Sequence, residues 1–560
     1  MLLAVLAFFC IPLSCSWSTT GYVAARKRMP SFCRASSQTA RTSGLCHGLA
    51  GTGVLPEKTV IVGGGPAGLA TAIALARRGW KEIHIYDRLH EPPDPDDRLA
   101  WSDTTRFYLI GLGGRGQKAL QSLGVWDEVQ RYTTAVVGRK DWDPGAGPDE
   151  GVEKIYKDRP YTTQVLARDR LAGILLRAVR DRHGQAIKIH YGVECTGAEW
   201  LSSKDSPGDE QVTLQLQPCG LSPGGEKKDS DVDAVPFKES TPLLIGADGA
   251  TRAIADALEI DQHNQRLKPR FRVTRYADDN VRVYKTVPLK VPKGWRFDIN
   301  YSSRSKDGRV VFDALPADKD GNYCGVLLLR ESDPMAKADS SATDLRSLLD
   351  EYVPQFSALV TDSALESVAK RPPSRLPKFR YVGPQLHRGS STVLLGDAIH
   401  TVKPYFGLGA NSALEDVCVL SDALDAAGDE LAPALSNFTK LRAQEAKALV
   451  RISRALDRPG LLGFFSFVLP LILDVISNKI APRLFAPNTI AMLQRDGMTF
   501  CDVLRRKRRD RLLQIAILSS AAVAMKFVIM SLVRLLRLAP GKSAFIAALL
   551  AVIAVGRGAF

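Results

Sequence analysis

Apolar and polar positions along the chain alternate between the period of strands and the period of helices, in the order typical of an α/β protein. From Lys58 to Asp87 (KTVIVGGGPAGLATAIALARRGWKEIHIYD) an apolar strand ends at Gly63, a helix ends at Gly79 and a second strand ends in Asp87. A strand, a helix and a second strand in this order predict a Rossmann-like unit.

A second region has the period of strands. From Phe271 to Leu329, runs such as VRVYKTVPLKV and YCGVLLL predict the strands of an inserted sheet, for which we expect bounds of about 263–387. The polar stretch 202–240 is expected to form a long surface hairpin or a mobile loop. We therefore expect a body at 57–455, followed by a helical region at 456–510.

The glycines after the first strand have the spacing Gly63-x-Gly65-x-x-Gly68. The first glycine permits the tight turn, the second lets the backbone approach a pyrophosphate, and the third lets the helix pack on the strand. The helix N-terminus supplies amides and a positive dipole end, and Asp87 can accept hydrogen bonds from a ribose. This segment predicts a dinucleotide site.

A second segment, Leu394 to Asp416 (LLGDAIHTVKPYFGLGANSALED), combines a carboxylate, a tight turn and bare backbone amides. The strand VLLG delivers Asp397 to the end of a sheet, where it can accept hydrogen bonds from a polyol or ribityl hydroxyl. The turn from Pro404 to Gly409 then leads into a helix whose first amides can face a pyrophosphate or a developing anion. Together with the first fingerprint, this second clamp suits FAD better than NAD.

Another Gly-x-Gly-x-x-Gly occurs at Gly111, Gly113 and Gly116. It can be interpreted as a separate nicotinamide-binding unit, because an apolar stretch precedes it and a helix follows. However, the next residues, QSLGVWDEVQ, continue as helix and turn without a second strand that ends in an acid.

The segment 396–416 resembles the second FAD motif of the class A flavoprotein monooxygenases, GD-x-x-H-x-x-x-P-[FY]-[FH]-G-x-G-x-N-x-x-x-ED, and it fills that motif without a gap. Among these aromatic hydroxylases the chain is most similar to the kynurenine hydroxylases, over about residues 57 to 460. The stretch Arg106 to Gly116 resembles another element of the family in register, which makes the second glycine fingerprint a coincidence. Pairs such as Leu315-Pro316 resemble the family's substrate-covering sheet.

The resemblance implies an FAD-dependent monooxygenase with a Rossmann-like FAD-binding domain of the glutathione-reductase type. In such an enzyme NADPH or NADH reduces FAD, and O2 then adds to the flavin as a C4a-hydroperoxide. One oxygen is transferred from there to an aromatic or lipophilic small molecule. The flavin carries that chemistry, so neither a nucleophile nor a metal is expected. Two alternatives remain open. One is an isoprenoid or carotenoid epoxidase or a flavin-dependent reductase, and the other is a degenerate, membrane-bound flavoprotein that carries electrons.

The candidate site residues fall into two groups. Arg106 is the candidate for holding a substrate anion or the flavin edge, and Tyr405 and Phe406 either line the substrate pocket or fill the core. His400 is expected to cap the turn at Asp397. The candidate cofactor-binding residues are Gly63, Gly65, Pro66, Ala67, Gly68, Asp87, Arg88, Arg168, Asp248, Gly396, Asp397, Pro404, Gly407, Gly409, Ala410 and Asn411.

The chain departs from the family at two places. The family's G-A-D-G-x-x-S-x-V-R corresponds to 246–255 here, with Arg252 in place of Ser and Ala255 in place of Arg, which puts the nicotinamide approach in doubt. The Asn-Tyr-x-Glu-Met element with which kynurenine hydroxylases help to hold their substrate corresponds to SRALDRPG at 453–460. Kynurenine as the substrate is therefore in doubt.

The formal net charge of +15 belongs to the two ends of the chain, since 1–56 contains five basic residues and no acid, and 505–560 contains eleven basic residues and only Asp510. The body is close to neutral, which removes the main support for a nucleic-acid partner. Four of the nine cysteines lie in the first 56 residues, and the other five are widely spaced, odd in number and without a C-x-x-C, which indicates a reducing compartment rather than a disulfide framework.

The first 56 residues have the composition of a targeting segment. Met1 to Leu13 is apolar but too short to span a bilayer, and the acid-free stretch that follows is rich in Ser and Thr. This resembles the bipartite leaders of algae with complex plastids, so a plastid is favoured over a mitochondrion. A mitochondrial presequence, or a plain signal peptide with a linker, remains an alternative.

The C-terminal residues 511–560 are expected to associate with a membrane. The basic block 505–511 (RRKRRDR) precedes 22 residues, 512–533, that are interrupted only by Lys526 and can span a bilayer or lie partly in its interface. A second apolar run, 543–555, suits a re-entrant or interfacial helix. The run 461–476, which Pro470 is expected to break, fits either a core helix or a membrane-facing one.

Overall fold

The computed structural model describes residues 55–102, 108–157, 159–202, 210–219, 235–265, 271–278, 280–337, 340–495 and 497–538. The chain divides into two units, Met1–His47 and Gly48–Phe560, and all of the described residues belong to the second. The expected targeting segment up to residue 54 and the apolar run 543–555 lie outside the described residues.

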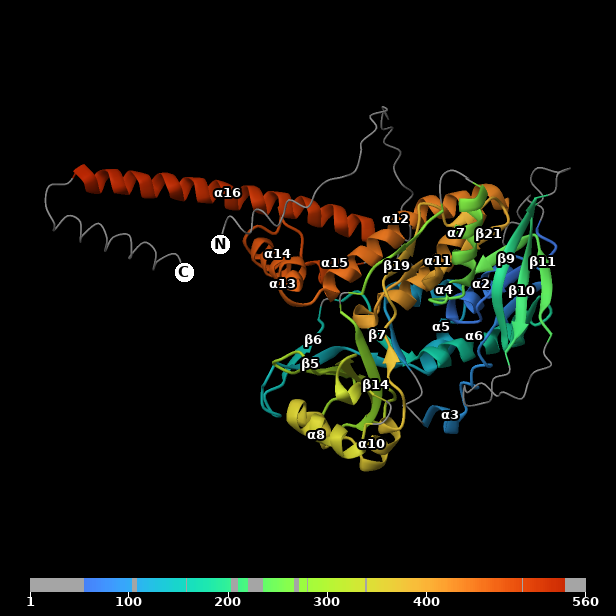
Figure 1. The fold of residues 1–560 in the computed structure, drawn as a ribbon, viewed down its shortest axis with the longest axis horizontal. Coiled ribbons are helices and arrows are strands. Elements are labelled where there is room, and N and C mark those ends of the chain that lie inside the picture. The colour runs from blue at the N-terminus through green and yellow to red at the C-terminus, as the bar shows by residue number, and fades with distance from the viewer. Residues whose placement is uncertain are drawn as a thin grey trace, which may run out of the picture. The chain divides into compact units, whose positions relative to one another are not determined.

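A six-stranded sheet forms the centre of the body (Figure 1). Its order is β20 (His387–Arg388), β21 (Thr392–Leu394), β12 (Leu243–Gly246), β1 (Thr59–Val62), β2 (Ile83–Asp87) and β8 (Ile187–Tyr191). All neighbouring pairs are parallel except β20 and β21. Every residue of β1, β12 and β21 is buried, as expected for parallel strands covered on both faces. The carboxyl ends of these three strands therefore meet at one edge.

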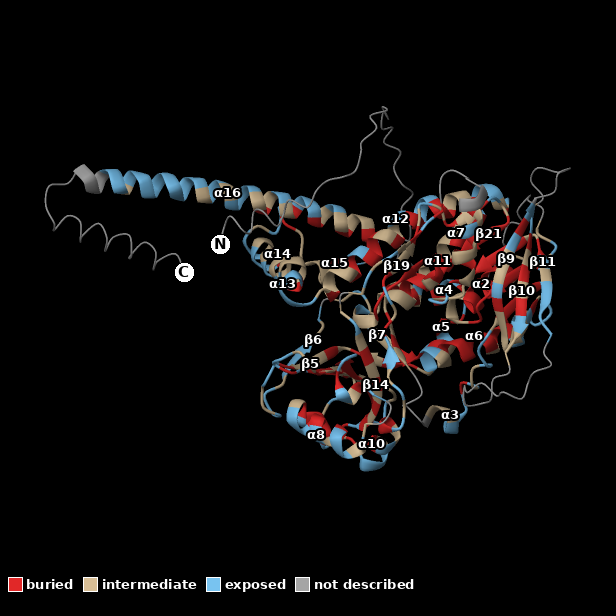
Figure 2. Cartoon of the chain, in the orientation of Figure 1, coloured by how far each residue is buried: buried red, intermediate tan, exposed pale blue. Residues whose placement is uncertain are grey.

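Helices pack around this edge, and α11 (Leu408–Ala426) is central among them. It contacts α2 (Pro66–Arg77), α4 (Gly114–Ser122) and α12 (Leu431–Asp457), while α2 also packs against α6 (Arg168–His183). Their buried faces belong to one hydrophobic core with the sheet, as Figure 2 shows by its red interior. Packing of helix on sheet thus joins segments that are far apart in the sequence.

A second, seven-stranded sheet lies below the first in Figure 1. Its order is β18 (Ser374–Arg375), β14 (Arg282–Lys290), β17 (Asn322–Arg330), β16 (Val311–Pro316), β15 (Ile299–Arg304), β5 (Gly138–Trp142) and β6 (Val152–Ile155). Five of these strands fall within the range expected for a substrate sheet, and β5 and β6 join them from an earlier part of the chain. The helices α8 (Ala342–Tyr352), α9 (Pro354–Ser357) and α10 (Asp362–Ala369) close a separate core against it.

Three small sheets complete the strand content of the described residues. They are β3 (Leu109–Leu112) with β7 (Thr163–Ala167) and β4 (Thr134–Val136); β9 (Val193–Ser202) with β10 (Glu210–Pro218) and β11 (Phe237–Thr241); and β13 (Val273–Arg275) with β19 (Arg380–Val382) and β22 (His400–Thr401). The described parts of the polar stretch 202–240 are therefore largely strand and pair antiparallel, which agrees with the expected hairpin and not with a loop throughout. The short helices are α3 (Arg98–Ser102), α5 (Trp126–Arg131), α7 (Ala253–Gln265), η1 (Pro334–Ala336), η2 (Gly396–Ala398) and η3 (Pro404–Phe406).

The C-terminal part is helical. It contains α13 (Gly460–Gly463), a π-helical turn (Phe464–Val468), α14 (Leu469–Ile480), α15 (Thr489–Leu493) and α16 (Phe500–Leu538). The expected break at Pro470 is wrong, because the helical run continues from 460 to 480. The wider π-turn precedes Pro470, which lacks an amide and would clash with a carbonyl of a regular helix.

Candidate functional site

Each glycine of the first fingerprint is needed for a different structural reason. Gly63 has φ +109°, and a Cβ there would lie 2.2 Å from the carbonyl oxygen of Ala247. A Cβ on Gly68 would lie 1.9 Å from the carbonyl oxygen of Gly63, so α2 packs on the loop only with glycine. A Cβ on Gly65 would meet nothing within 4 Å. No atom of the described residues fills the space at Gly65, which leaves room for the close approach of a pyrophosphate.

Within the described part of the chain, no side chain caps the N-terminus of α2. Gly65 is the N-cap, Pro66 occupies the first turn, and that turn contains no acid. Because the first amides of an α-helix have no acceptor within the helix, those of α2 point out of its N-terminus. An uncapped N-terminus beside an open glycine suits a phosphate.

Asp87 closes the loop from the neighbouring strand. Its carboxylate accepts the Gly64 amide at 2.6 Å and the Leu89 amide at 2.7 Å. Each oxygen keeps a further lone pair that a ribose hydroxyl can use. Arg88, half-exposed, lies 3.8 Å from Glu194.

The Gly-Asp loop lies against the first fingerprint. Gly396 has φ +61°, and a Cβ there would lie 3.3 Å from the Cβ of Ala67 and 3.1 Å from that of Ala413. The loop is therefore inserted between α2 and α11. Burial raises the pKa of Asp397, although His400, Arg252 and Arg168 favour its charged form.

Asp248 follows β12 beside the same loop. Its Oδ2 accepts the Ile254 amide at 3.1 Å, whereas its buried Oδ1 has no hydrogen-bond partner in the described part of the chain. Burial raises the pKa of Asp248 to about 6, despite backbone hydrogen bonds and Arg252. A buried, partnerless oxygen next to Gly63 fits a cofactor hydroxyl.

Arg252, the first departure from the family, is fully buried and has φ +60°. Its guanidinium donates to the carbonyl oxygen of Asp397 at 2.9 Å and to the Thr401 hydroxyl at 2.5 Å. Burial lowers its pKa to about 10. Arg252 thus stabilises the turn after Asp397 by hydrogen bonds from the protein interior. Ala255, the other changed residue, lies in the hydrophobic core.

His400 does not cap the Asp397 turn, contrary to the expectation from the sequence. Its Nε2 lies 2.9 Å from Asp416 Oδ2, the same oxygen that accepts the Gly396 amide at 2.9 Å. The carbonyl of Asp397 is satisfied by Arg252 and by the Thr401 hydroxyl at 3.0 Å. Sequence distance suggested the wrong partner, since the true one comes from α11.

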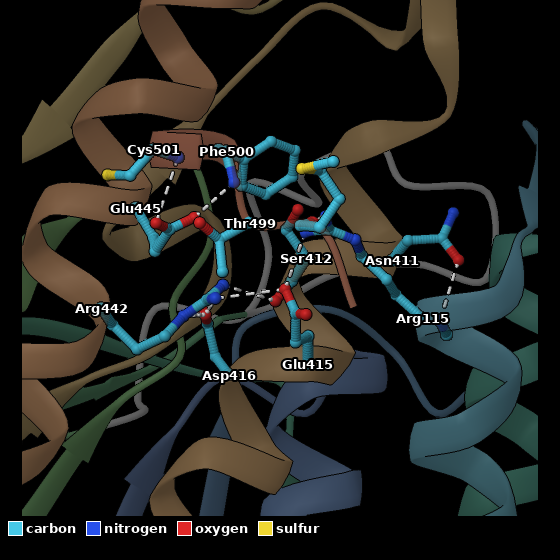
Figure 3. A network of polar contacts seen from close by, with 12 residues as sticks. Arg115, Asn411, Ser412, Glu415, Asp416, Arg442, Glu445, Thr499, Phe500 and Cys501 are labelled. Atoms are coloured by element: carbon cyan, nitrogen blue, oxygen red, sulfur yellow. Dashed lines mark hydrogen bonds and ion pairs between the residues drawn. The ribbon is translucent and has the colours of Figure 1, made fainter. Parts of the chain in front are cut away.

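Asp416 and Arg442 form a buried ion pair, which lies in the left half of Figure 3. Arg442 Nε donates to Asp416 Oδ1 at 2.6 Å, and its Nη1 lies 3.1 Å from Glu415 Oε2. Burial alone would raise the pKa of Asp416, but Arg442 and His400 outweigh it and hold the pKa below its usual value. This pair fixes α11 to α12 behind the Gly-Asp loop.

The same network reaches the start of α16. Glu415 Oε2 also pairs with Arg115 Nη1 at 3.1 Å, and the Arg115 guanidinium lies 4.1 Å from the centre of the Phe500 ring. Glu445 accepts the Phe500 and Cys501 amides at 2.7 and 3.1 Å, which caps α16 (Figure 3).

Asn411 explains the second glycine fingerprint. Its Oδ1 accepts the amides of Gly113 and Gly116 at 2.8 and 3.2 Å, and its Nδ2 donates to the carbonyl oxygens of Gly111 and Gly407 at 2.8 and 2.6 Å. A Cβ on Gly116 would lie 2.4 Å from that Oδ1. These glycines let α4 approach α11, and the side chain of Asn411 is used for this packing.

The turn 404–406 is anchored by its preceding residue. The fully buried Lys403 ammonium donates to Asp278 at 2.9 Å, to Asp457 at 2.8 Å and to the carbonyl oxygen of Asn280 at 2.7 Å. Tyr405 hydrogen-bonds to the same Asp457, and burial raises its pKa. Phe406 is 37% exposed, so it is not a core residue.

The remaining turn residues lie close by. Pro404 begins η3, Gly407 has φ +60° as the N-cap of α11, and Ala410 packs on the main core. A Cβ on Gly409 would lie 3.8 Å from Asp397 Oδ1. Arg106 lies outside the described residues. No cluster of metal-ligating side chains occurs among the residues that are described.

Two tyrosines between the Gly-Asp loop and the large sheet were missed by sequence reasoning. The rings of Tyr108 and Tyr284 are 6.3 Å apart, and burial raises the pKa of Tyr108, with Tyr284 and Asp397 adding to the shift. Arg168, at the start of α6, acts electrostatically on both Asp397 and Tyr284. The sequence contains no signal for this pair, because Tyr284 lies on β14 of the large sheet whereas Tyr108 directly precedes β3, far away along the chain.

Comparisons with known proteins agree with this arrangement. The family described as "FAD binding domain" matches residues 240–453, and the "NAD(P)-binding Rossmann-like domain" matches residues 61–92. Kynurenine 3-monooxygenase of Salinispora tropica is 26% identical over 474 residues, which cover 82% of this chain and 92% of that protein. The enzyme of the same name from Xanthomonas euvesicatoria is 24% identical over 400 residues, covering 71% and 78%.

Solved structures share the fold. Klebsiella pneumoniae HpxO complexed with FAD and uric acid aligns with a TM-score of 0.51 and 17% identity, over 80% of this chain and 97% of that one. The tetrameric form of 2-methyl-3-hydroxypyridine-5-carboxylic acid oxygenase aligns with a TM-score of 0.51 and 18% identity, over 73% and 94%.

We predict that Gly65→Ala folds but loses FAD, because the new methyl group meets no protein atom and occupies the space left at the loop. The dissociation constant for FAD should rise at least about tenfold, measured by quenching of flavin fluorescence, with an unchanged melting temperature of the apoprotein. Gly294→Ala, equally free of contacts within 4 Å but outside the site, is the control. Equal FAD affinity in both variants would contradict this assignment of Gly65.

We predict that Arg442→Met destabilises the fold by about 3–5 kcal/mol, because it leaves Asp416 buried without its cation. The pKa of Asp416 is lower in the folded state than in the unfolded state, where it is about 4. The pair therefore stabilises the fold fully at pH values above the unfolded pKa, and this stabilisation is lost as the pH falls through the folded pKa. Urea unfolding should therefore show the largest difference from wild type at neutral pH.

The control for this prediction is Arg375→Met, which removes a pair with Glu331 from a side chain that is 77% exposed. It should cost under about 1 kcal/mol. A similar loss in both variants would mean that the buried pair has no special role.

Proposed function

Because the chain is an FAD-dependent monooxygenase related to the kynurenine 3-monooxygenases, we propose that it uses NADPH or NADH and O2 to hydroxylate an aromatic or lipophilic small molecule. In the overall reaction NAD(P)H, a proton, O2 and the substrate give NAD(P)⁺, water and the product with one added oxygen. Bound FAD supplies the reduction of O2 and the transfer of one of its atoms.

The observation that carries the proposal is the convergence of three distant segments at one edge of the central sheet. The open glycine loop at Gly65, the partnerless oxygen of Asp248 and the Gly-Asp loop at Asp397 all lie there. The fit supports Asp87 and the α2 amides as the adenosine and pyrophosphate contacts, with Asp397 and the first amides of α11 as the second clamp.

The side chains beyond the Gly-Asp loop support an aromatic or lipophilic substrate. The rings of Tyr108 and Tyr284 pack together at the large sheet, and Phe406, in the turn that follows the Gly-Asp loop, is partly exposed. Their part would be to orient the substrate and to exclude water, while Arg168 favours the charged form of Asp397. Arg106 stays a candidate for holding a substrate anion.

Kynurenine itself is not the substrate that we propose. At 453–460, where the kynurenine hydroxylases have their substrate-holding element, Asp457 is already bound by Lys403, Asn280 and Tyr405. A carboxylate saturated in this way is unavailable for a substrate ammonium group.

The test is oxidation of NADPH and of NADH by the full-length, FAD-loaded protein in detergent, followed with an oxygen electrode and a peroxide assay. We expect an extract of aromatic and lipophilic metabolites to accelerate flavin reduction and to consume O2 without matching peroxide, because the oxygen is transferred. Incorporation of one atom from ¹⁸O2 into the product identifies a hydroxylation or an epoxidation. Reduction of a substrate without oxygen uptake would favour the reductase, and bound FAD that NAD(P)H never reduces would favour the electron carrier.

We also propose that the segment up to residue 56 directs the protein to a plastid and that the C-terminal helices attach it to a membrane. The acid-free leader and the two apolar helical runs of the described chain support this. A fluorescent protein fused behind residues 1–56 should enter the plastid of an alga with complex plastids, and its accumulation in mitochondria would contradict the plastid assignment.

A further inference from the structure

Two helical runs near the C-terminus, Gly460–Ile480 and Phe500–Arg534, are long and apolar enough to cross a membrane, judged over the described residues. The first run is largely unburied, and its exposed apolar residues include Leu461, Phe464, Val468, Ile472, Val475 and Ile480. Figure 2 shows that α16 is likewise exposed over most of its length. Composition alone therefore cannot separate a spanning helix from one that lies on the surface.

The buried Asp474, in the middle of α14, fixes the position of the first run along α16. Its carboxylate pairs with Lys507 at 3.2 Å and with Arg511 at 2.7 Å, both from the basic block 505–511. Gln514 adds hydrogen bonds to the carbonyl oxygen of Leu473 at 3.2 Å and to the Ser477 hydroxyl at 3.0 Å. The middle of α14 is therefore held beside the junction at which α16 changes from basic to apolar.

Both ends of the first run are also held on the protein side of that junction. The Ser466 hydroxyl donates to the carbonyl oxygen of Ala455 on α12 at 3.2 Å. After α14, the carbonyl oxygen of Leu484 accepts Arg506 at 2.9 Å. With 466 tied to α12 and 484 tied to the basic block, neither end can reach the opposite leaflet of a bilayer.

The charges at this level fit lipid headgroups. Arg505, Arg508 and Arg509 are exposed, and cationic side chains are strongly disfavoured within the hydrocarbon region but attracted to an anionic surface. From Leu512 onward α16 carries the 22-residue apolar run, a length that spans a bilayer. The basic block therefore marks the headgroup layer.

We propose that Gly460–Ile480 lies flat in the headgroup layer of a membrane with an anionic surface, with its apolar side chains toward the acyl chains, and that α16 alone among the described helices spans. The proposal rests on the membrane attachment proposed above and adds its geometry. Asp474 is the residue that holds the surface helix parallel to the membrane, by its pairs with Lys507 and Arg511.

The experiment uses the full-length, FAD-loaded protein in vesicles of phosphatidylcholine with about 30% phosphatidylglycerol, an anionic lipid. A fluorescent amino acid replaces Val475 on α14 or, as a matched position, Val528 on α16; the two side chains are 52% and 54% exposed. Spin-labelled lipids quench the fluorescence, with the label placed either near the glycerol or near the methyl end of the acyl chain.

We expect the label at 475 to be quenched more by the glycerol-proximal lipid and the label at 528 more by the methyl-end lipid. Stronger quenching at 475 by the methyl-end lipid would mean that this helix spans. Quenching at 475 by neither lipid would mean that the face binds something other than a membrane. Either result overturns the proposal.

The role of Asp474 is tested with Asp474→Asn, which removes the charge that pairs with Lys507 and Arg511. The preference for the shallow quencher at 475 should fall at least about twofold as the helix loses its fixed level, while retained FAD fluorescence reports an intact body. Asp502→Asn, which removes only an exposed pair with Arg505 on α16, is the control. An unchanged profile in Asp474→Asn would refute the role of this ion pair.

Flotation of the vesicles separates the two levels of the proposal. Wild-type protein that does not float with the vesicles contradicts membrane attachment itself. Protein that floats but shows deep quenching at 475 contradicts only the surface position of Gly460–Ile480. Oxygen uptake and NAD(P)H oxidation are measured independently and test the proposed reaction.

Discussion

The charge of the buried Asp416 is the constraint on which the geometry of the site depends. Its carboxylate is excluded from water and accepts the Gly396 amide, His400 and Arg442. A buried carboxylate is tolerated only when such partners are in place, because its desolvation is costly. Since these partners come from the Gly-Asp loop, from β22 and from α12, one charge holds a loop, a strand and two helices together. The position of Asp397 beside the open glycine loop follows from this.

The helix α12 connects the site with the C-terminal part. Along one helix, Arg442 neutralises Asp416, Glu445 caps the first turn of α16, and Asp457 receives Lys403 and Tyr405. An unbroken helix transmits the position of one end to the other, as a flexible linker does not. The catalytic body is thus fixed to α16 by buried polar contacts. On the proposed arrangement, the turn 404–406 is joined to the membrane surface by the short link between Asp457 and Gly460, which suits a lipophilic substrate.

The departures from the family motif are accommodated by the structure. In the motif Arg252 stands in place of a small residue, and here its guanidinium serves two acceptors of the turn after Asp397. Both bonds come from Nη2 of the guanidinium, which carries two N–H donors and can therefore serve two neighbouring acceptors. This use of Arg252 gives the changed segment a structural role and weakens the interpretation of the chain as a degenerate flavoprotein. The second glycine fingerprint has an equally structural explanation in the packing of α4 against Asn411.

The sequence by itself determined the helices, strands and loops that depend only on neighbouring residues. The strand, loop and helix around Gly63 to Asp87 follow from hydrophobic period and glycine spacing, and the start of α11 follows from the turn before it. The polar partners could not be predicted in this way. His400 was paired with the wrong residue, the helical run through Pro470 was expected to break, and Tyr108 with Tyr284 gave no signal.

Only the tertiary structure decided these features, for a common physical reason. Burial and pairing depend on which distant segments meet. A long stretch of chain separates Lys403 from Asp278, and another separates Asp474 from Arg511. No local pattern predicts the path of such a stretch. From the sequence, 461–476 fitted either a core helix or a membrane-facing one, and only the helix lengths in the structure show that Gly460–Ile480, like Phe500–Arg534, is long enough to cross a membrane. The ion pairs that tie the first run to the basic block restrict its position, and these exist only in the folded chain.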